Sequence, residues 1–492
     1  MYKESIQRGI EMNQKKRKMR LSFPVTLATV ICLLLGMSLT AYADSTHIHG
    51  GETYLEWTDE LARAQNGSSS TASNSLPKTP GFYYLTKDVF LKSGEFWDVP
   101  TGTTHLCLNN HGIIQKVGFE VHHVIEINRH ETLYLYDDHT PKPTHTYSTT
   151  IFGLATVGGP GKTFTGGYIT GGEGNIAGCV RINGGTFNLF GGTIIGNRTA
   201  VNGGGVNNNG GTFNMYGGAI IGNYGPRRSP RAPGGAGVYN NGTFRMWGGE
   251  ISGNTTTHDG GGVYNDARGT FFMYDTAKIT NNRSGRNGGG YGGGGVFNRG
   301  TFIMQGGEIS GNRTSYYCGG VQNEGTFKLY SDAIIRGNFG GTSADVQGTV
   351  TIVSDSNTNG PDDNAPTWTV TVKTLTYNGN AQKLLTAGTG NSGKLYYAVT
   401  TENTAPPNES LYTTSIPTAT EVGTYYVWLK IKWDDNHTDT FPFCIPVTIS
   451  VNMIDENAIN ALPQTGDTAR PLLYGLAVLV ALFGLGLLIK KK

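Results

Sequence analysis

The sequence predicts an all-β protein in which a right-handed parallel β-helix is followed by a small β-sandwich module. Two observations carry this prediction. Glycine makes up 74 of the 492 residues, roughly twice the usual share of about 7%. The excess is concentrated in residues 151–350, where segments with an apolar period of two recur at a nearly constant interval. Strict Gly-X-Y repetition is absent, which excludes collagen.

The repeat has the form Val-x-Asn, followed by Gly-Thr-Phe-x-Met/Leu-x-Gly-Gly-x-Ile-x-Gly-Asn, with small variations. Each copy supplies three short strands, and the Gly-Gly and Gly-Asn pairs supply corners with positive φ. Three strands and three corners in about 25 residues make one coil of a β-helix, in which like residues stack on like. A β-propeller blade needs about 40 residues, so that fold does not fit. Six copies are marked by the threonine of their Thr-Phe pair, and a weaker copy precedes them: Thr186, Thr212, Thr243, Thr270, Thr301 and Thr326, with Lys162–Thr170 upstream.

The C-terminus has three successive parts, of which the first is a pentapeptide, Leu462-Pro463-Gln464-Thr465-Gly466. An apolar run, Leu472–Ile489, and three lysines follow. Eighteen helical residues span about 27 Å, close to the thickness of a hydrocarbon core, and the lysines keep their end in the cytoplasm. This arrangement resembles the sorting signal of Gram-positive cell-wall proteins, L-P-x-T-G. The resemblance implies that a sortase thiolate attacks the carbonyl of Thr465, and that a peptidoglycan amine then takes the acyl group.

The N-terminus is predicted to be a signal peptide. A basic stretch precedes the apolar run Leu21–Leu39, and small residues allow cleavage between Ala43 and Asp44. A plain membrane anchor is the alternative. After both processing steps, residues 44–465 keep 27 basic and 33 acidic groups, a formal net charge of −6. Nucleic-acid binding therefore has no electrostatic basis, and the membrane is reached only through the C-terminal helix of the precursor.

Composition divides the chain into successive parts. The predicted parts are a signal peptide (1–43), a polar leader (44–80), a β-helix (81–354, with clear repeats at 179–340), a linker (355–366), a β module (367–452), a spacer (453–461) and the sorting signal with its transmembrane helix and basic tail (462–492). The β-helix resembles the glycine-rich, pectate-lyase-like repeats of bacterial surface proteins. Two segments of the β module, Leu375–Gly379 and Gly423–Val427, resemble bacterial immunoglobulin-like spacer domains.

A β-helix also suggests a polysaccharide lyase or glycoside hydrolase, which would need clustered carboxylates. Glu250 and Glu308 share one repeat position, and Lys278 occupies it in the coil between them. This pattern predicts an exposed charge ladder of little energetic weight rather than a catalytic site. The pairs Asp137-Asp138 and Asp434-Asp435 fall in turn-like settings. No catalytic residue and no cofactor are predicted.

The position that follows the Met/Leu of each repeat is expected to face outward, and it is aromatic in five of six coils: Phe190, Tyr216, Trp247, Tyr274 and Tyr330. Ring faces along one side could bind a glycan or a host protein. The alternative is that the rings fold over the Gly-Gly corner or are covered by loops. Basic insertions, with Arg227, Arg228 and Arg231, could contact an anionic polysaccharide, but plain solvated loops are the favoured interpretation.

Metal binding and disulfides are not predicted. His47 and His49, and the pair His122-His123, offer imidazoles, but no third ligand follows at a useful spacing. Cys179 and Cys318 lie about five coils apart, beyond the reach of a disulfide. Together with Cys107 and Cys444, they are expected to be buried free thiols.

The sequence as a whole predicts a peptidoglycan-anchored surface protein that acts as an adhesin or in surface display. A polysaccharide-degrading enzyme and a purely structural wall component remain the alternatives.

Overall fold

The computed structural model describes residues 47–450, with short gaps. The gaps are 117–122, 150–154, 159–160, 175–177, 226–233, 286–291, 316, 331, 342–344, 354–366, 374, 391–392, 403–405 and 433–441. Several predicted features lie outside the described residues. They are the signal peptide with Ala43 and Asp44, the linker, the spacer, the sorting signal, Arg227, Arg228, Arg231, His122, Asp434 and Asp435.

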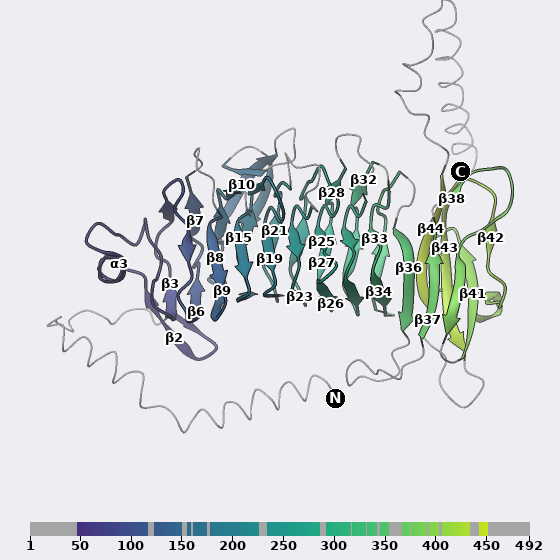
Figure 1. Ribbon diagram of the computed structural model, residues 1–492, viewed down its shortest axis with the longest axis horizontal. Helices are drawn as coiled ribbons and strands as arrows, with labels where there is room; N and C mark the ends of the chain where they lie inside the picture. The colour runs from purple at the N-terminus through teal and green to yellow at the C-terminus, as the bar shows by residue number, and fades with distance from the viewer. Residues whose placement is uncertain are drawn as a thin grey trace, which may run out of the picture. The chain divides into compact units, whose positions relative to one another are not determined.

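The repeats form a β-solenoid of about nine turns, which confirms the predicted β-helix. Each coil contributes one strand to each of three faces, and neighbouring coils pair in parallel. In Figure 1 these strands stand side by side from β3 to β36. We name the faces after the residue that their strands bury in the repeats, the Val, Phe and Ile faces.

The Val face consists of β5 (Trp97–Asp98), β8 (Ile125–Asn128), β15 (Val180–Asn183), β19 (Val206–Asn209), β22 (Val238–Asn240), β25 (Val263–Asn265), β29 (Val296–Asn298), β33 (Val321–Asn323) and the first part of β36 (Val346–Val353). The Phe face consists of β2 (Glu52–Glu56), β3 (Gly81–Tyr84), β6 (Gly102–Cys107), β9 (Glu131–Tyr136), β16 (Thr186–Leu189), β20 (Thr212–Met215), β23 (Thr243–Met246), β26 (Thr270–Met273), β30 (Thr301–Met304), β34 (Thr326–Leu329) and the last part of β36. The Ile face consists of β4 (Val89–Leu91), β7 (Gly112–Gln115), β13 (Tyr168–Thr170), β17 (Thr193–Ile195), β21 (Ala219–Ile221), β24 (Glu250–Ser252), β27 (Lys278–Thr280), β31 (Glu308–Ser310) and β35 (Ile334–Arg336).

The core of the solenoid is a set of ladders, as the repeat predicts. Phe213 stacks on Phe244 with ring centroids 4.7 Å apart, and Phe244 stacks on Phe271 at 4.6 Å. These rings are fully buried, and their planes lie within 8° of parallel along the whole series. The ladder therefore combines burial of large apolar area with ring stacking in every coil. Its members are Phe187, Phe213, Phe244, Phe271, Phe302 and Phe327.

Asparagine forms a second buried ladder at the corner that follows the Ile face. The backbone N–H and the side-chain Nδ2 of each residue both donate to Oδ1 of the next, at about 3 Å. The preceding glycine takes positive φ, for example 62° at Gly253, which explains the Gly-Asn pair. The ladder consists of Asn197, Asn223, Asn254, Asn282, Asn312 and Asn338, and it ends on Asp345.

The prediction that residues 44–80 form a loose leader is wrong for the part the structure describes. β1 (His47–His49) and β2 form a hairpin, and β2 pairs in parallel with β3 as the start of the Phe face. Helix α3 (Asp59–Asn66) follows, capped by the Thr58 side chain. Trp57 is fully buried, and its indole N–H donates to the carbonyl of Ser75. The high Ser and Asn content of the segment concealed these few anchoring apolar residues.

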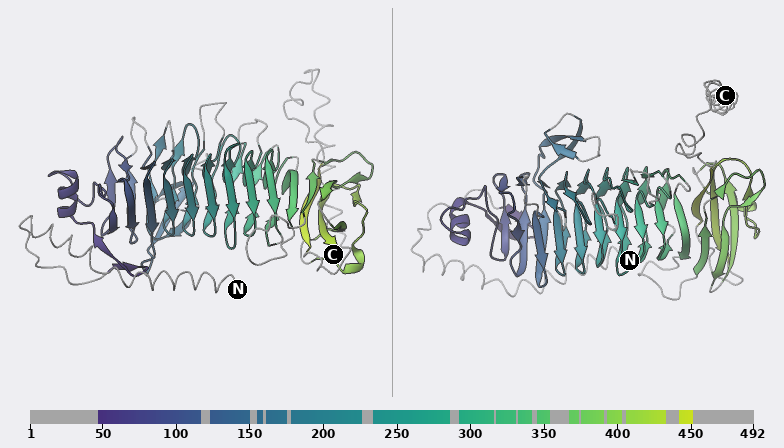
Figure 2. Two further views of the ribbon diagram at one scale, coloured as in Figure 1. Left: turned by 60° about the horizontal axis from the view of Figure 1, so that its bottom comes forward. Right: turned by 45° about the horizontal axis from the view of Figure 1, so that its top comes forward.

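The prediction that residues 162–170 form an early copy of the repeat is only half correct. Tyr168–Thr170 forms β13 on the Ile face, as expected. Its Thr-Phe part, however, lies in β12 (Lys162–Thr165), which pairs with β10 (Thr144–Thr149). With β11 (Ala155–Val157) these strands form an antiparallel sheet. It projects from the coils and is drawn in blue in the right-hand view of Figure 2. The place on the Phe face beside β16 is taken by β9.

Further strands are short or belong to the C-terminal module. Two pairs lie beyond the asparagine corner: β14 (Glu173–Gly174) with β18 (Arg198–Thr199), and β28 (Arg283–Ser284) with β32 (Arg313–Thr314). The C-terminal elements are β37 (Thr367–Val372), β38 (Leu375–Thr376), β39 (Gln382–Lys383), β40 (Thr386–Gly390), β41 (Lys394–Thr400), the 3-10 helix η1 (Glu409–Leu411), β42 (Thr418–Ala419), β43 (Gly423–Lys432) and β44 (Phe443–Ser450).

The C-terminal module is joined to the solenoid by hydrogen bonds. β37 pairs antiparallel with β36, so the last strand of the solenoid is also a strand of the module. One hydrophobic core runs from Trp57 to Ile449, so the solenoid and the module form one compact unit. An all-β fold is therefore confirmed. The likeness to an immunoglobulin domain stays a prediction.

Candidate functional site

The outward aromatic residues of the repeats form one continuous stack. We call Phe190, Tyr216, Trp247 and Tyr274 the aromatic stripe. Each lies directly after a strand of the Phe face, and its backbone N–H donates to a carbonyl of the preceding coil, for example Trp247 to Met215 at 2.9 Å. Successive ring centroids lie 4.5, 4.6 and 5.5 Å apart, and the planes lie within 11° of parallel. The ladder register therefore brings four of the five predicted residues together.

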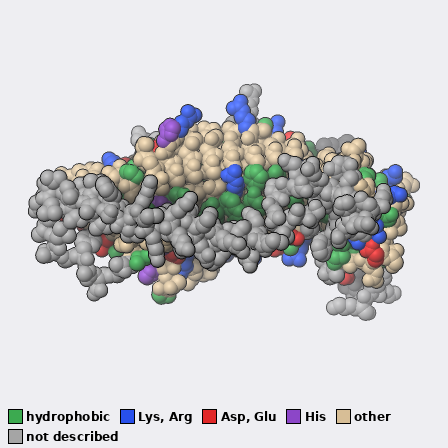
Figure 3. All heavy atoms as spheres, turned by 90° about the horizontal axis from the view of Figure 1, so that it is seen from below, with side chains coloured by type: hydrophobic (Ala, Val, Ile, Leu, Met, Phe, Trp, Pro, Cys, Tyr) green, Lys and Arg blue, Asp and Glu red, His purple; other side chains and the backbone are tan. Residues whose placement is uncertain are grey.

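The stripe presents ring edges to solvent, and this corrects the expectation of open faces. Phe190 and Tyr216 are 39% and 42% exposed, whereas Trp247 and Tyr274 are half-buried. Because the rings are nearly parallel and in stacking contact, their faces cover one another and their exposed area lies mainly at the ring edges. Figure 1 places β23, β26 and β34 along the lower side of the solenoid. Figure 3 shows hydrophobic side chains gathered near the middle of the side seen from below.

Tyr330 does not belong to the stripe, although the repeat predicts it there. The Tyr330 side chain is only 6% exposed, because it packs against Val353 and Ile303. In the coil between Tyr274 and Tyr330, Gln305 occupies the equivalent position, so the series of aromatic residues is interrupted there. The stripe therefore ends at Tyr274.

The stack extends further toward the N-terminus than the sequence predicts. The ring of Tyr136 lies 4.9 Å from that of Phe190, in the register position that precedes it. A parallel column of rings, His105 between Phe82 and Tyr134, has spacings of 4.3 Å on both sides. Burial lowers the pKa of His105 to about 4, so its ring is neutral at physiological pH. These coils lack the Gly-Thr-Phe pattern, and only the alternation in Tyr134–Tyr136 signalled them.

The carboxylates that the sequence analysis weighed as catalytic candidates form ion pairs and hydrogen bonds within the fold. Lys278 lies in register between Glu250 and Glu308, as the sequence predicts, and Glu308 also pairs with Arg336 at 3.1 Å. Asp137 is buried and accepts hydrogen bonds from the backbone of Asn110 and Gly167. A β-helix occurs in enzymes and in non-enzymes, and nothing in this fold shows catalytic activity.

Two other carboxyls have raised pKa values. Burial raises the pKa of Asp259 to about 7, an effect that the amide of Gly292 opposes. Burial likewise raises the pKa of Asp345 to about 6, while its bonds to Asn338 oppose the shift. Asp345 ends the asparagine ladder, so its position is explained by that structural role.

The four cysteines in the described part of the chain differ in their surroundings, although the sequence predicts all of them to be buried. Cys107, Cys179 and Cys318 are buried, whereas Cys444 is half-buried. Burial raises the pKa of the Cys107 and Cys444 thiols to about 12. An unperturbed thiol would be more acidic, so these side chains are not activated nucleophiles on their own.

Two further side chains that can bind a metal, Asp138 and Cys107, lie beside the histidines of β1, where the sequence spacing predicted no third ligand. His47 Nε2 lies 2.6 Å from His49 Nε2, and His49 Nδ1 lies 2.6 Å from Asp138 Oδ2. The Cys107 thiol completes the group, 3.9 Å from Asp138 Oδ1. Sequence spacing could not reveal this group because the turns of the solenoid, rather than a local motif, bring β1, β6 and the end of β9 together.

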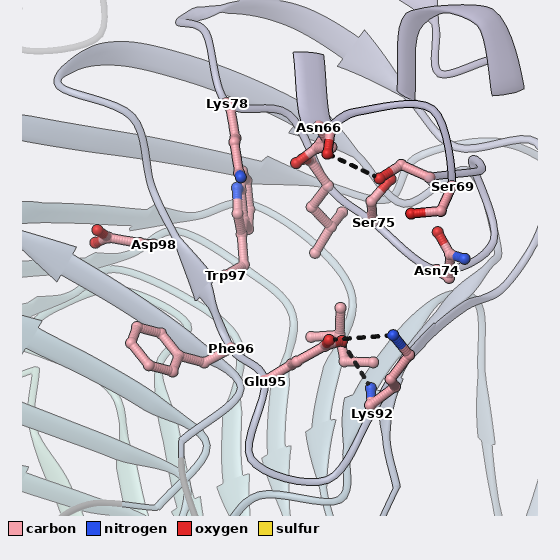
Figure 4. Close-up of a pocket in the computed structure, with 13 residues that line it drawn as sticks. Asn66, Ser69, Asn74, Ser75, Lys78, Lys92, Glu95, Phe96, Trp97 and Asp98 are labelled. Atoms are coloured by element: carbon pink, nitrogen blue, oxygen red, sulfur yellow. Dashed lines mark hydrogen bonds and ion pairs between the residues drawn. The ribbon is translucent and has the colours of Figure 1, made fainter. Parts of the chain in front are cut away.

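A polar cavity of about 410 Å³ lies beside α3 at the start of the solenoid. In Figure 4 the Glu95 side chain points to Lys92, with which it forms an ion pair at 3.5 Å, and Trp97 lies nearby. The Trp97 indole donates to the carbonyl of Pro77. Glu95, Lys92 and Trp97, at the edge of this cavity, thus bond to other groups of the protein.

Comparison with known proteins identifies the C-terminus. A family model described as the LPXTG cell wall anchor motif matches residues 454–492. No curated protein and no solved structure matches the chain. Among the described residues no helix has the length and apolarity to cross a membrane, and the predicted helix within 472–489 lies outside them.

The fold and the matched motif define the chain as a surface protein built on a β-solenoid and anchored to the cell wall. More particularly, its LPXTG motif makes it a substrate of sortase, which attaches it to peptidoglycan from a membrane-bound precursor.

Proposed function

We propose that the protein is an adhesin that binds a host or matrix macromolecule through the aromatic stripe. The observation that carries this proposal is the unbroken stack of Phe190, Tyr216, Trp247 and Tyr274 with partly exposed edges. Singly exposed aromatic residues need no explanation, whereas a contiguous row on one face is typical of a binding surface. Attachment to the wall would present this row outside the cell.

The ring orientation favours a protein ligand over a sugar. A sugar ring stacks on an aromatic face, and the stripe keeps its faces turned toward one another. The partly exposed rings form an apolar ridge, and Tyr216, Trp247 and Tyr274 each add one polar group to it. Tyrosine and tryptophan are enriched in protein interfaces because one side chain offers apolar area and a polar group. The ridge therefore suits a groove on a partner protein.

A glycan is the second candidate ligand. Asn214 and Arg245 lie in register beside the stripe and offer polar groups that can hydrogen-bond sugar hydroxyls. A sugar that contacts these groups and the exposed ring edges should bind weakly, because the ring faces of the stripe cover one another.

Binding assays with immobilised extracellular-matrix proteins and with a glycan array test the proposal. The wild-type protein should bind a member of one panel, and Trp247→Ala should weaken that binding by at least about tenfold, as expected for a central aromatic residue. Phe339→Ala is the matched control, since Phe339 is an exposed aromatic residue outside the stripe. Equal affinity of the wild type and Trp247→Ala would contradict the proposal.

A further inference from the structure

We propose that His47, His49, Cys107 and Asp138 form a binding site for one Zn²⁺ ion. Each residue offers one ligand atom, and these four atoms all lie within 4.8 Å of one another. The contacts between them are short: 2.6 Å between the two histidine rings, 2.6 Å from His49 to Asp138, and 3.9 Å from Cys107 to Asp138. Two imidazoles, a thiol and a carboxylate meet at one point on the Phe face.

The ligand types favour zinc over other biological cations. Ca²⁺ and Mg²⁺ take oxygen ligands, of which this site offers only one carboxylate. Zn²⁺ accepts nitrogen, sulfur and oxygen in one tetrahedral site, at bond lengths of about 2.0–2.3 Å. Those bond lengths separate ligand atoms by roughly 3.3–3.8 Å. The two histidine nitrogens would move apart, and the more distant ligand atoms would move closer, by up to about 1.5 Å.

The packing around the cluster holds both imidazoles in place. The His47 ring stacks on Tyr84 at 4.5 Å, and the His49 ring stacks on Tyr136 at 5.3 Å. Tyr54 meets the His49 ring edge-on at 4.5 Å. Cys107 lies in register between Tyr84 and Tyr136, so its thiol is directed at the space between the two histidines. Ligands oriented by their neighbours in this way lose little entropy on binding a metal.

The site combines a buried thiol with an accessible carboxylate. Cys107 is fully buried, whereas the Asp138 side chain is 60% exposed. An ion can thus enter from the Asp138 side. Binding forms the Zn–S bond and releases the thiol proton to solvent, and the thiolate and carboxylate charges then balance the two charges of the ion.

Zinc bound here would cross-link the first coils of the solenoid. His47 and His49 lie on β1, Cys107 ends β6, and Asp138 follows β9. The end of a solenoid needs a cap because its terminal coil has a neighbour on one side only. The four protein ligands fill a tetrahedral site, which indicates a structural rather than a catalytic ion.

Metal analysis of the wall-form protein, released by peptidoglycan digestion, tests this inference. The protein should retain one equivalent of Zn²⁺ after gel filtration, and Zn²⁺ should raise its melting temperature by at least about 3 °C. Co²⁺ substituted for Zn²⁺ should show the visible bands of tetrahedral cobalt and a thiolate charge-transfer band. Wild-type protein without bound Zn²⁺, or without these bands after cobalt loading, would overturn the proposal.

Variants assign the ligands. His49→Gln and Cys107→Ser should lose the bound equivalent and the thermal shift, and Cys107→Ser should also lose the charge-transfer band. Cys444→Ser is the matched control for a thiol elsewhere and should keep all three. Asp138→Asn changes an exposed side chain and so leaves folding intact, and it should weaken Zn²⁺ binding by at least about tenfold. Full retention of zinc by Asp138→Asn and His49→Gln would overturn the proposed ligand set.

Discussion

Asn282 Oδ1 accepts two hydrogen bonds from Asn254, one from the backbone N–H at 3.0 Å and one from Nδ2 at 2.9 Å. Asn254 Oδ1 in turn accepts the same pair from Asn223. All three side chains are fully buried. Each coil therefore satisfies the polar groups of the next at a buried corner.

Removing one member of this ladder should destabilise the solenoid strongly. Asn254→Ala leaves the two donors of Asn223 without their acceptor, and we expect a loss of about 3 kcal/mol in the free energy of unfolding. Urea denaturation measures this loss. Asn209→Ala is the control, because Asn209 is exposed and should cost no more than about 0.5 kcal/mol. Similar losses in the two variants would contradict a stabilising role for the ladder.

The carboxyl at the end of the ladder should make stability depend on pH. Burial raises the pKa of Asp345 to about 6 from its ordinary value of 3.8, so the folded state binds the proton more tightly than the unfolded state. Asp345 therefore stabilises the folded state fully below about pH 4, and this stabilisation is lost as the pH rises to about 6. Asp345→Asn keeps the acceptor oxygen and removes the charge.

This variant should be more stable than the wild type at pH 8, by up to about 3 kcal/mol, and no more stable at pH 3. Thermal denaturation across this pH range measures the difference. Asp275→Asn is the control, because Asp275 is exposed. A gain that is the same at both pH values would show that Asp345 does not titrate as described.

The matched anchor motif makes a clear prediction for the cell. Thr465→Ala should move the protein from the wall fraction to the membrane and medium, because the variant keeps the backbone carbonyl but loses the threonine side chain that the LPXTG recognition sequence requires. Immunoblots after peptidoglycan digestion measure the distribution. Thr468→Ala, which lies between the pentapeptide and the apolar run, should leave this distribution unchanged. Wall attachment that persists in Thr465→Ala would contradict sorting at this motif.

Tyr330 and Trp247 occupy equivalent positions in the repeat, but replacing them should change the free energy of unfolding by different amounts. Tyr330 is buried against Val353, so Tyr330→Ala should lower the free energy of unfolding by about 3 kcal/mol. Trp247 is half-buried and stacked between two rings, and Trp247→Ala should cost only about 1 kcal/mol. Chemical denaturation of both variants tests the distinction. The reverse order would mean that the stripe is part of the core.

The repeat predicted the parts of the fold that are local. The period of two placed Phe213 and Met215 on the buried side, and the nearly constant copy length placed Phe213 on Phe244. The outward position of Trp247 follows from the same alternation. These inferences succeed because a solenoid coil contacts mainly its neighbours, so sequence period and spatial neighbourhood coincide.

The remaining features depend on contacts outside this period. Val353 covers Tyr330 because β36, which lacks the Gly-Thr-Phe pattern, continues the Phe face in parallel register with β34. The face-to-face stacking of Tyr216 and Trp247 depends on side-chain rotation, which alternation does not determine. The grouping of His49 with Cys107 joins coils of unequal length that lack the repeat, so sequence spacing carried no signal for it.

The central claim is that the aromatic stripe is a ligand-binding surface, and titration with the ligand tests it most directly. Wild-type protein, Trp247→Ala and Phe339→Ala are titrated with the matrix protein or glycan that the wild type binds. We predict that Trp247→Ala binds at least about tenfold more weakly, with Phe339→Ala unchanged. Equal affinities for all three, or no binding by folded wild-type protein to either panel, would contradict the claim.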